Sequence, residues 1–422
     1  MVKKIGIIGL GNVGSATLKS LAEYSSLVSR RTSLKIEIKL ACDLRKGKGK
    51  IAAKYGVAFT TDVSKVLNDP QIDTIVELIG GIEPAYSFIK EALLKGKNIV
   101  TANKALLAER GQELFFLARK VGKNIGFEAS VCGAIPLIKS ISEGLVSCEI
   151  KKIYGILNGT TNYILYKMGQ EKIDFSSALR RAQKKGFAEK KPHFDISGID
   201  TLNKLCILSY LCFGVWPSLK RVYTEGISKI DMLDIVYAEE LNYRVKLLAI
   251  AKRQGKFLDL RVHPTLVPIG HPLSGVSSTY NAVYLDTQPA GDLLFYGRGA
   301  GGMATSSAVI SDIVSMSLDS KISERKKENI ILKNITTVKS RYYMRFMAYD
   351  EPGVLAKVSK ILASQHISIA SVTQKEKLRR KFVPVIMITH AAKESDMQKA
   401  LLKIDKLSVI KSPSQIIRIE DF

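Results

Sequence analysis

The sequence predicts an α/β fold in three parts: a doubly wound domain of the Rossmann type, a second mixed α/β domain, and a ferredoxin-like βαββαβ module. The chain has 422 residues, and domains usually hold roughly 150 residues each. Residues 1–130 alternate short apolar runs with helical patterns, as a doubly wound parallel sheet requires. At Lys321–Asn329 the chain becomes charged and loses its apolar periodicity, which indicates a linker.

The first domain is expected to span residues 1–130 and to be completed by a segment at about 290–320. Its apolar runs predict five strands, at Lys4–Ile8, Glu37–Cys42, Asp73–Leu78, Asn98–Thr101 and Asn124–Glu128. Helical periodicity follows several of these strands, at Ser15–Leu27, Pro84–Lys95 and Gln112–Val121. Alternating strands and helices of this kind are typical of a parallel sheet.

The second domain is expected over residues 131–320. Its pattern changes to long helices, predicted at Thr201–Phe213 and Asp231–Ala251, and to strands at Val262–Pro268 and Asn281–Leu285. After a linker at 321–336, the third domain is expected over residues 337–422. Its six elements are predicted at Arg341–Ala348, Val354–Leu362, Ile367–Gln374, Phe382–Thr389, Lys393–Ile404 and Ile416–Ile419.

The composition excludes several classes of protein. With 46% apolar and 24% charged residues, the chain is neither disordered nor of low complexity. The longest apolar stretch, Leu205–Trp216, is far shorter than the roughly 20 residues that cross a bilayer. No signal peptide is recognised at the start, so a cytoplasmic protein is expected. Five cysteines without paired spacing argue against a disulfide framework and against a zinc site.

The charge balance is strongly basic, because 64 Lys and Arg against 39 Asp and Glu give +25. Such a surplus fits nucleic acid or anionic ligands. The basic residues lie in short scattered clusters without interleaved aromatic residues. Solvated surface charge is therefore the favoured interpretation, and nucleic acid is not an expected partner.

A glycine-rich turn directly follows the first predicted strand and opens a helix. It consists of Gly9, Leu10, Gly11, Asn12, Val13 and Gly14. The first glycine permits the tight turn, the second lets the backbone approach a pyrophosphate, and the third lets helix and strand pack closely. The turn therefore predicts a dinucleotide site at the helix N-terminus.

Two signals after the second predicted strand disagree about which dinucleotide binds. Asp43 is placed to bond a ribose 2′-hydroxyl, as in NAD sites. Arg45 follows it, with Lys46, Lys48 and Lys50 beyond, and these cations are placed to hold a 2′-phosphate. The cations favour NADP, and NAD stays open.

The segment 186–204 holds the densest chemistry of the chain. It contains the carboxylates Glu189, Asp195 and Asp200 and ends at Lys204, one helical turn after Asp200. Such a cluster suits an ammonium group beside a proton-exchanging lysine, and the alternative is an exposed ion pair. Lys104 follows the strand Asn98–Thr101 and thus lies at the carboxyl edge of the sheet, where ligands bind in open α/β folds. Taken alone, Lys104 also fits a solvated surface lysine.

These motifs and others, in order along nearly the whole chain, resemble homoserine dehydrogenase. The matching segments are Gly9–Gly14, Thr101–Lys104, Phe127–Val131, Asn158–Tyr163, Gly186–Lys204, His271–Leu273, Asn281–Val283 and Gly297–Gly302, with Thr305 after them. The third domain resembles an ACT domain whose ligand loop begins with Asp350, Glu351, Pro352 and Gly353.

The resemblance implies reversible hydride transfer between NAD(P)H and L-aspartate 4-semialdehyde, giving L-homoserine, in threonine, methionine and isoleucine biosynthesis. Lys204 matches the general acid that protonates the developing alkoxide, and Lys104 matches its partner at the reacting oxygen and the nicotinamide. The residues that match the substrate site are Glu189, Asp200, Asp195, Gly159 and Thr160.

The resemblance also implies contacts with the cofactor and with a cation. Gly186 and Gly301 match glycines that approach the cofactor. The cation site, an oxygen cage suited to Na⁺, would be formed by Glu128 with the carbonyls of Val131, Gly133 and Ile135. Cys132 and Ala134 depart from the residues more usual in that loop, and Lys190 and Lys191 replace an acid before Pro192.

The ACT resemblance implies an amino-acid effector, expected to be L-threonine as feedback inhibitor, in a homodimer or homotetramer. A dimerisation module without a ligand is the alternative. An alternative of another class is a non-catalytic sensor of dinucleotide and amino acid. The presence of Lys104 and Lys204 favours the enzyme, since a sensor needs neither lysine. The segment Asn158–Thr160 argues against a related reductase of a cyclic imine.

Overall fold

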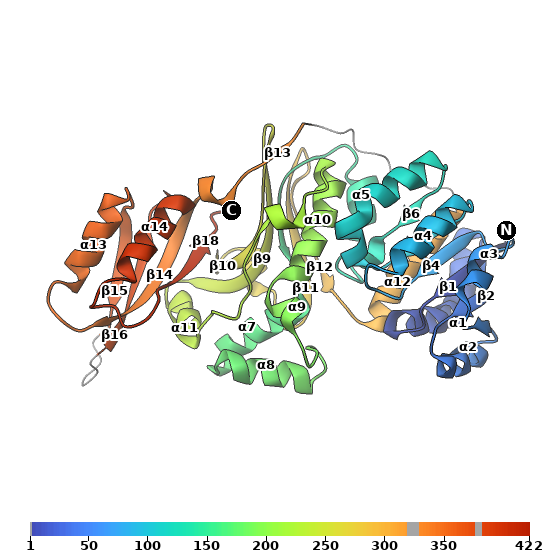
Figure 1. Ribbon diagram of the computed structural model, residues 1–422, viewed down its shortest axis with the longest axis horizontal. Coiled ribbons are helices and arrows are strands. Elements are labelled where there is room, and N and C mark those ends of the chain that lie inside the picture. The colour runs from blue at the N-terminus through green and yellow to red at the C-terminus, as the bar shows by residue number, and fades with distance from the viewer. Residues whose placement is uncertain (1, 319–328, 376–381) are drawn as a thin grey trace. The chain divides into compact units, whose positions relative to one another are not determined.

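A parallel sheet occupies the first part of the chain in the computed structural model, which describes residues 2–318, 329–375 and 382–422 (Figure 1). Its strand order is β3-β2-β1-β4-β5-β6. The strands are β1 (Val2–Ile8), β2 (Lys35–Cys42), β3 (Ala58–Thr60), β4 (Thr74–Glu77), β5 (Asn98–Thr101) and β6 (Ile125–Gly126). The order reverses between β1 and β4, and ligands of such sheets bind at the carboxyl ends of the strands beside this reversal.

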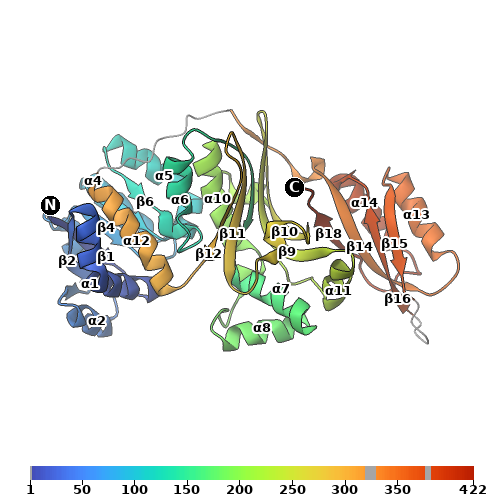
Figure 2. The ribbon, with the colours of Figure 1, turned by 180° about the vertical axis from the view of Figure 1, so that it is seen from behind.

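Helices cover the parallel sheet and complete its core. They are α1 (Asn12–Thr32), α2 (Gly49–Lys54), α3 (Val63–Asn68), α4 (Ala85–Leu94), α5 (Lys104–Lys120) and, from much later in the chain, α12 (Gly302–Ser317). Figure 2 shows α12 over the sheet, and Ser20 of α1 and Ser306 of α12 join their hydroxyls at 2.7 Å. Apolar residues of both helices, among them Leu18 and Val309, pack on Ile5 and Ile7 of β1.

The chain forms two compact units. The first comprises residues 1–151, 203–219 and 280–329, and the second comprises residues 152–202, 220–279 and 330–422. The first unit also contains α6 (Leu137–Lys139) and the hairpin of β11 (Tyr280–Gln288) and β12 (Gly291–Arg298). The boundaries of these two units do not coincide with the domain limits expected at residues 130, 320 and 337. Those domain limits therefore stay predictions.

A second sheet runs through the second unit in the order β7-β9-β10-β18-β14-β16-β15. Its strands are β7 (Glu149–Ile156), β9 (Tyr243–Gln254), β10 (Phe257–Pro268), β14 (Lys339–Tyr349), β15 (Ile369–Gln374), β16 (Phe382–Thr389) and β18 (Gln415–Ile419), with short pairings of β8 (Tyr223–Thr224), β13 (Ile331–Leu332) and β17 (Ala392–Lys393). Strand β18 pairs in parallel with β10, placing Arg418 opposite Thr265, and antiparallel with β14. One continuous sheet therefore joins the C-terminal module to the middle of the chain.

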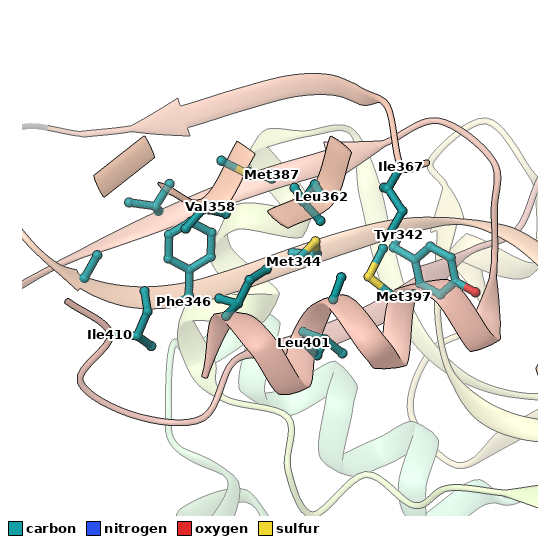
Figure 3. Packing of buried hydrophobic residues seen from close by; sticks show 14 of the residues in the cluster. Tyr342, Met344, Phe346, Val358, Leu362, Ile367, Met387, Met397, Leu401 and Ile410 are labelled. Carbon is teal, nitrogen blue, oxygen red and sulfur yellow. The ribbon is translucent and has the colours of Figure 1, made fainter. Parts of the chain in front are cut away.

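The remaining helices of the second unit fall into two groups. Those of the middle of the chain are α7 (Gly159–Glu171), α8 (Phe175–Lys184), α9 (His193–Ile196), α10 (Ile199–Phe213), which continues into the first unit, and α11 (Met232–Glu240). Those of the C-terminal module are α13 (Val354–Ser364) and α14 (Glu394–Ile404). Figure 3 shows the core of this module, where Met344 and Phe346 of β14 pack with Val358 of α13 and Leu401 of α14. The predicted βαββαβ order is confirmed.

The structure corrects several element predictions. The helix predicted at Asp231–Ala251 is wrong in its second half: α11 ends at Glu240, and β9 begins at Tyr243. Asn242 lies between them with φ of 62°, in the left-handed region where helices commonly end. Helix α5 begins at Lys104, well before the predicted Gln112.

Part of the predicted linker, residues 321–328, lies outside the described residues. Its remainder contains β13 and a single 3₁₀ turn at Ile335–Thr337. Within the part of the chain that the structure describes, no helix is long and apolar enough to cross a membrane.

Candidate active site

The glycine-rich turn between β1 and α1 has the geometry that a pyrophosphate needs. Gly9 has φ of 102°, and a Cβ there would lie 2.7 Å from the backbone of Leu78. A Cβ on Gly14 would lie 2.0 Å from the Gly9 carbonyl oxygen, whereas a Cβ on Gly11 would meet nothing within 4 Å. Gly9 and Gly14 thus permit close packing, and Gly11 leaves open space at the N-terminus of α1.

Beside this turn, Asp43 and Arg45 form an ion pair at the end of β2. Asp43 is buried and accepts hydrogen bonds from the amide of Leu10 at 2.8 Å and from Nε and Nη2 of Arg45, each at 2.9 Å. The Arg45 guanidinium holds the pKa of Asp43 well below its usual range. Both residues line a cavity of about 420 Å³ that also contains Gly9 and Gly11.

The N-terminus of α12 lies against the start of α1. A Cβ on Gly302 would lie 2.8 Å from Oδ1 of Asn12, the first residue of α1. Gly301, which precedes α12, has φ of 121°. The structure therefore brings Gly301 to the glycine-rich turn, although about two thirds of the chain separates them in sequence.

Lys104 is the first residue of α5, after the loop that follows β5. Asn103 caps this helix through the Leu106 amide at 3.1 Å, and its side-chain nitrogen donates to the Gly81 carbonyl at 2.6 Å. Beneath the loop, the fully buried Glu77 accepts hydrogen bonds from the Ile79 amide at 2.8 Å and from the Thr101 hydroxyl at 2.7 Å. Burial raises the pKa of Glu77, and these donors oppose the rise. Glu77 thus joins the loops after β4 and β5, and so holds the segment from which Lys104 begins.

Lys204 lies on α10 and is buried. The part of α10 beyond it packs against α5, where the rings of Tyr210 and Phe115 lie 5.2 Å apart. The helix of Lys204 is therefore packed on the helix that begins with Lys104.

In the second unit, one amide joins two of the predicted carboxylates. The side-chain nitrogen of Asn158 donates to Oδ1 of Asp195 and to Oδ2 of Asp200, both at 2.8 Å. Its oxygen caps α7 by accepting from the Thr161 amide at 2.8 Å. Asp200 and Asn158 are buried. Two carboxylates that share one amide donor create a negative site suited to an ammonium group.

The other predicted residues of the second unit lie on the surrounding loops. Gly159 begins α7, and a Cβ there would lie 2.5 Å from the Thr279 carbonyl oxygen. The Thr160 hydroxyl donates to the Phe187 carbonyl at 2.6 Å. Glu189 is exposed between α8 and α9, and Gly186 has φ of 73° at the end of α8.

The carboxylate of the predicted cation loop, Glu128, supports the segment that follows it. Both oxygens of the buried Glu128 accept backbone amides, of Ile138 and Lys139, each at 2.8 Å. The Ile135 carbonyl accepts the Leu137 amide at 2.7 Å. Left-handed backbone at Cys132 and Gly133 forms the turn between the predicted carbonyls. Carbonyl and carboxylate oxygens are both ligands that suit a hard cation, and the Glu128 carboxylate also stabilises a helix start.

Sequence reasoning missed Asn158 and Glu77 as site residues. Asn158 had a detectable signal, because an Asn before a Gly-Thr-Thr run is a typical helix cap. Glu77 had none, since it reads as the polar end of a strand. Both act by joining segments that are distant in sequence.

Three family profiles match the chain. "Homoserine dehydrogenase" matches residues 136–314, "Homoserine dehydrogenase, NAD binding domain" matches residues 9–128, and "ACT domain" matches residues 342–409. The chain is 40% identical to a homoserine dehydrogenase of Helicobacter pylori, covering 99% of each chain. It is 38% identical to that of Neisseria gonorrhoeae, covering 99% of this chain and 98% of the relative. A crystal structure of a homoserine dehydrogenase from Thiobacillus denitrificans superposes with a TM-score of 0.94 at 39% identity, over 100% of this chain and 99% of the other.

Proposed function

Because the chain belongs to the homoserine dehydrogenase family and is thus a nicotinamide-dependent oxidoreductase, we propose how its residues bind homoserine, transfer the proton and select the cofactor. The observation that carries the proposal is the pair of carboxylates, Asp195 and Asp200, joined by the Asn158 amide, with Asp200 on the helix that continues to Lys204. This arrangement supplies an anionic site for an amino acid, and it places an acid–base group on the helix that carries one of the two carboxylates.

The substrate's ammonium group is held by Asp200 and Glu189, with Asp195, Gly159 and Thr160 lining the site. Charge-assisted hydrogen bonds of carboxylates to an ammonium group are about twice as strong as neutral ones. The exposed Glu189 supplies its carboxylate from the loop between α8 and α9.

When bound, a reduced nicotinamide dinucleotide would supply the hydride that the aldehyde carbon of L-aspartate 4-semialdehyde accepts. As the carbonyl oxygen gains negative charge, the Lys204 ammonium donates its proton, giving the hydroxyl of L-homoserine. In the reverse direction Lys204 accepts that proton. Lys104 stabilises the same oxygen by its positive charge, and positioned charge of this kind is a major source of catalysis. The product leads to threonine, methionine and isoleucine.

The dinucleotide is held by Gly9, Gly11, Asn12, Val13, Gly14, Gly186 and Gly301, with Lys104 at its nicotinamide end. We favour NADP because Asp43 uses only two of the five N–H donors of Arg45 and fixes that guanidinium beside the cavity. The remaining donors suit a 2′-phosphate, whereas in NAD a ribose hydroxyl would compete with Arg45 for Asp43.

The test is homoserine oxidation with NADP⁺ and NAD⁺ in parallel, in the wild-type chain and in Arg45→Ala. We expect the KM for NADP⁺ to rise about 10- to 100-fold, as loss of charge-assisted phosphate contacts predicts, and the KM for NAD⁺ to change little. Equal losses for both cofactors would favour NAD, with Asp43 as the ribose ligand. Absence of homoserine oxidation with either cofactor would contradict the assigned substrate.

A hard monovalent cation, Na⁺, belongs to the proposal through the carbonyls of Val131, Gly133 and Ile135, and Glu128 contributes by holding the loop. Replacing Na⁺ by a bulky organic cation at constant ionic strength should lower the melting temperature. An unchanged melting temperature would remove Na⁺ from the proposal.

The C-terminal ACT domain binds L-threonine at the turn Asp350–Gly353, in a homodimer or homotetramer. Gly353 has φ of 88° and opens α13, and Gln374 donates to Asp350 at 3.1 Å. Gly353→Asp should abolish inhibition by threonine and spare the reaction. If threonine inhibits both proteins alike, it binds at the substrate site, and if it inhibits neither, the domain serves dimerisation or another ligand.

A further inference from the structure

A buried arginine connects the ACT domain to the part of the second unit that carries the substrate carboxylates. Arg418 lies on β18 with 2% of its surface exposed. Its Nε and Nη2 bind both oxygens of Glu394, the first residue of α14, at 2.9 and 2.6 Å. Its Nη1 binds Glu225 at 3.0 Å, and its Nη2 also binds the Tyr223 hydroxyl at 3.0 Å. One guanidinium thus joins α14 to the segment Tyr223–Ile227.

The partners of Arg418 are themselves fixed. Glu394 also accepts the Tyr342 hydroxyl at 2.9 Å, and the Tyr223 hydroxyl donates to Glu225 at 2.8 Å. Burial would raise the pKa of Glu394, but the hydrogen bonds and charge of Arg418 outweigh it, so the pKa is lowered and the pair stays ionised. Bidentate arginine–carboxylate pairs impose strict geometry, and a buried charge that loses its partner is strongly destabilising.

The segment Tyr223–Ile227 packs directly behind α9. A Cβ on Gly226 would lie 2.0 Å from the Ile196 carbonyl oxygen. The same oxygen accepts a hydrogen bond from the Ile227 amide at 2.9 Å. A shift of this segment would therefore be transmitted to α9.

The segment Tyr223–Ile227 also contacts Gly198, which forms the corner between α9 and α10. A Cβ on Gly198 would lie 3.2 Å from Cγ2 of Thr224 and 3.5 Å from the Glu225 carbonyl oxygen. This corner carries Asp195 on one side and Asp200 on the other, the two carboxylates that Asn158 joins.

We propose that Arg418 is a positioning residue for the substrate: by fixing Glu225 and Tyr223, it sets the corner that carries Asp195 and Asp200. The affinity for homoserine then depends on a side chain of the C-terminal module, and displacement of α14 or β18 weakens substrate binding without altering hydride transfer. The inference rests on the proposed roles of Asp195 and Asp200.

The decisive variant is Glu225→Ala, because the Glu225 side chain is 21% exposed and Arg418 keeps Glu394 as a partner. We expect the KM and the dissociation constant for homoserine to rise about 5- to 20-fold, with kcat and the cofactor KM within about twofold, the pattern of lost ground-state binding. Glu225→Gln keeps an acceptor for Arg418 and should restore most of the affinity. Arg418→Met should give a larger rise.

The matched control is Arg345→Met. Arg345 of β14 also forms a bidentate pair, with the buried Asp234 at 2.6 and 3.0 Å, but this pair does not include the segment Tyr223–Ile227. The Arg345→Met substitution should lower the melting temperature and leave the homoserine KM unchanged.

A wild-type homoserine KM in Glu225→Ala would overturn the proposal, as would an equal rise in Arg345→Met, which would indicate general destabilisation. If Arg418→Met does not fold, the two Glu225 variants decide. Absence of homoserine oxidation by the wild-type chain would instead contradict the proposed function.

Discussion

The glycine-rich turn of the first unit and the carboxylate cluster of the second unit use different chemistry to prepare for a ligand. The turn uses backbone: two of its glycines have no room for a Cβ, and Gly11 has open space. The cluster uses buried side chains, joined by the Asn158 amide. A site made of backbone is sensitive to added atoms, whereas a site made of side chains is sensitive to removed ones. The comparison predicts different responses to alanine in the two regions.

Removing the reacting side chain should have the largest effect. Lys204→Ala should lower kcat by about 100-fold or more, because general acid–base catalysis contributes that much. Cofactor affinity should stay near the wild-type value, since Lys204 is not among the residues proposed to hold the dinucleotide. Steady-state kinetics and a fluorescence titration with NADPH measure both quantities. Retention of most of the turnover in Lys204→Ala would remove Lys204 from the mechanism.

Removing the amide that joins the carboxylates should have the next largest effect. Asn158→Ala leaves Asp195 and Asp200 without their shared donor, so we expect the KM for homoserine to rise about 10- to 50-fold, as loss of a buried hydrogen-bond partner predicts. Glu189→Gln at the exposed position should give a smaller rise. If Glu189→Gln has the larger effect, the exposed loop, and not the buried pair, dominates substrate binding.

Adding one methyl group to the glycine-rich turn should separate stability from binding. Gly14→Ala places a Cβ against the Gly9 carbonyl oxygen and should lower the free energy of unfolding by about 1–3 kcal/mol, as overpacking does. Gly11→Ala should keep the stability but weaken dinucleotide binding about tenfold, because the methyl group fills the space of the pyrophosphate. Thermal melting with and without NADP⁺ distinguishes the loss of stability in Gly14→Ala from the loss of dinucleotide binding in Gly11→Ala. Normal NADP⁺ affinity in Gly11→Ala would show that the cofactor does not approach this residue.

The smallest expected effect is that of a buried lysine, Lys246, which contacts α7. Lys246 donates to Oδ1 of Asn162 on α7 at 3.3 Å, and burial lowers its pKa to about 8. Between pH 8 and about 10.4 the unfolded chain keeps a proton that the folded chain has released, so this lysine makes the free energy of unfolding increase with pH. Lys246→Met should remove that increase, which is at most about 3 kcal/mol. Urea titrations of both proteins at pH 7.5 and 9.5 measure it, and equal changes would mean that Lys246 is not buried as a neutral amine.

Local signals in the sequence account for what could be predicted. The glycine-rich turn could be recognised because strand, turn and helix are adjacent in the chain. The pattern of β9 does not distinguish strand from helix, because its residues from Val245 to Ala251 are all buried and, apart from Lys246, apolar, and such a run has no clear period. The hydrogen bonds of Glu77, Asn158 and Arg418 were not predictable, because each joins segments whose proximity only the folded chain creates.

The position of β18 between β10 and β14 also has a consequence during synthesis. Strand β10 leaves the ribosome long before β18 exists, so its segment at Thr265 and Leu266, which pairs with β18, waits without this partner while the ACT domain is made. Unpaired strand edges invite pairing with other chains, and sheets that depend on distant partners form slowly. We therefore expect the nascent chain to need protection by chaperones until β18 has been made, and fragments that end before Gln415 to aggregate when they are expressed alone.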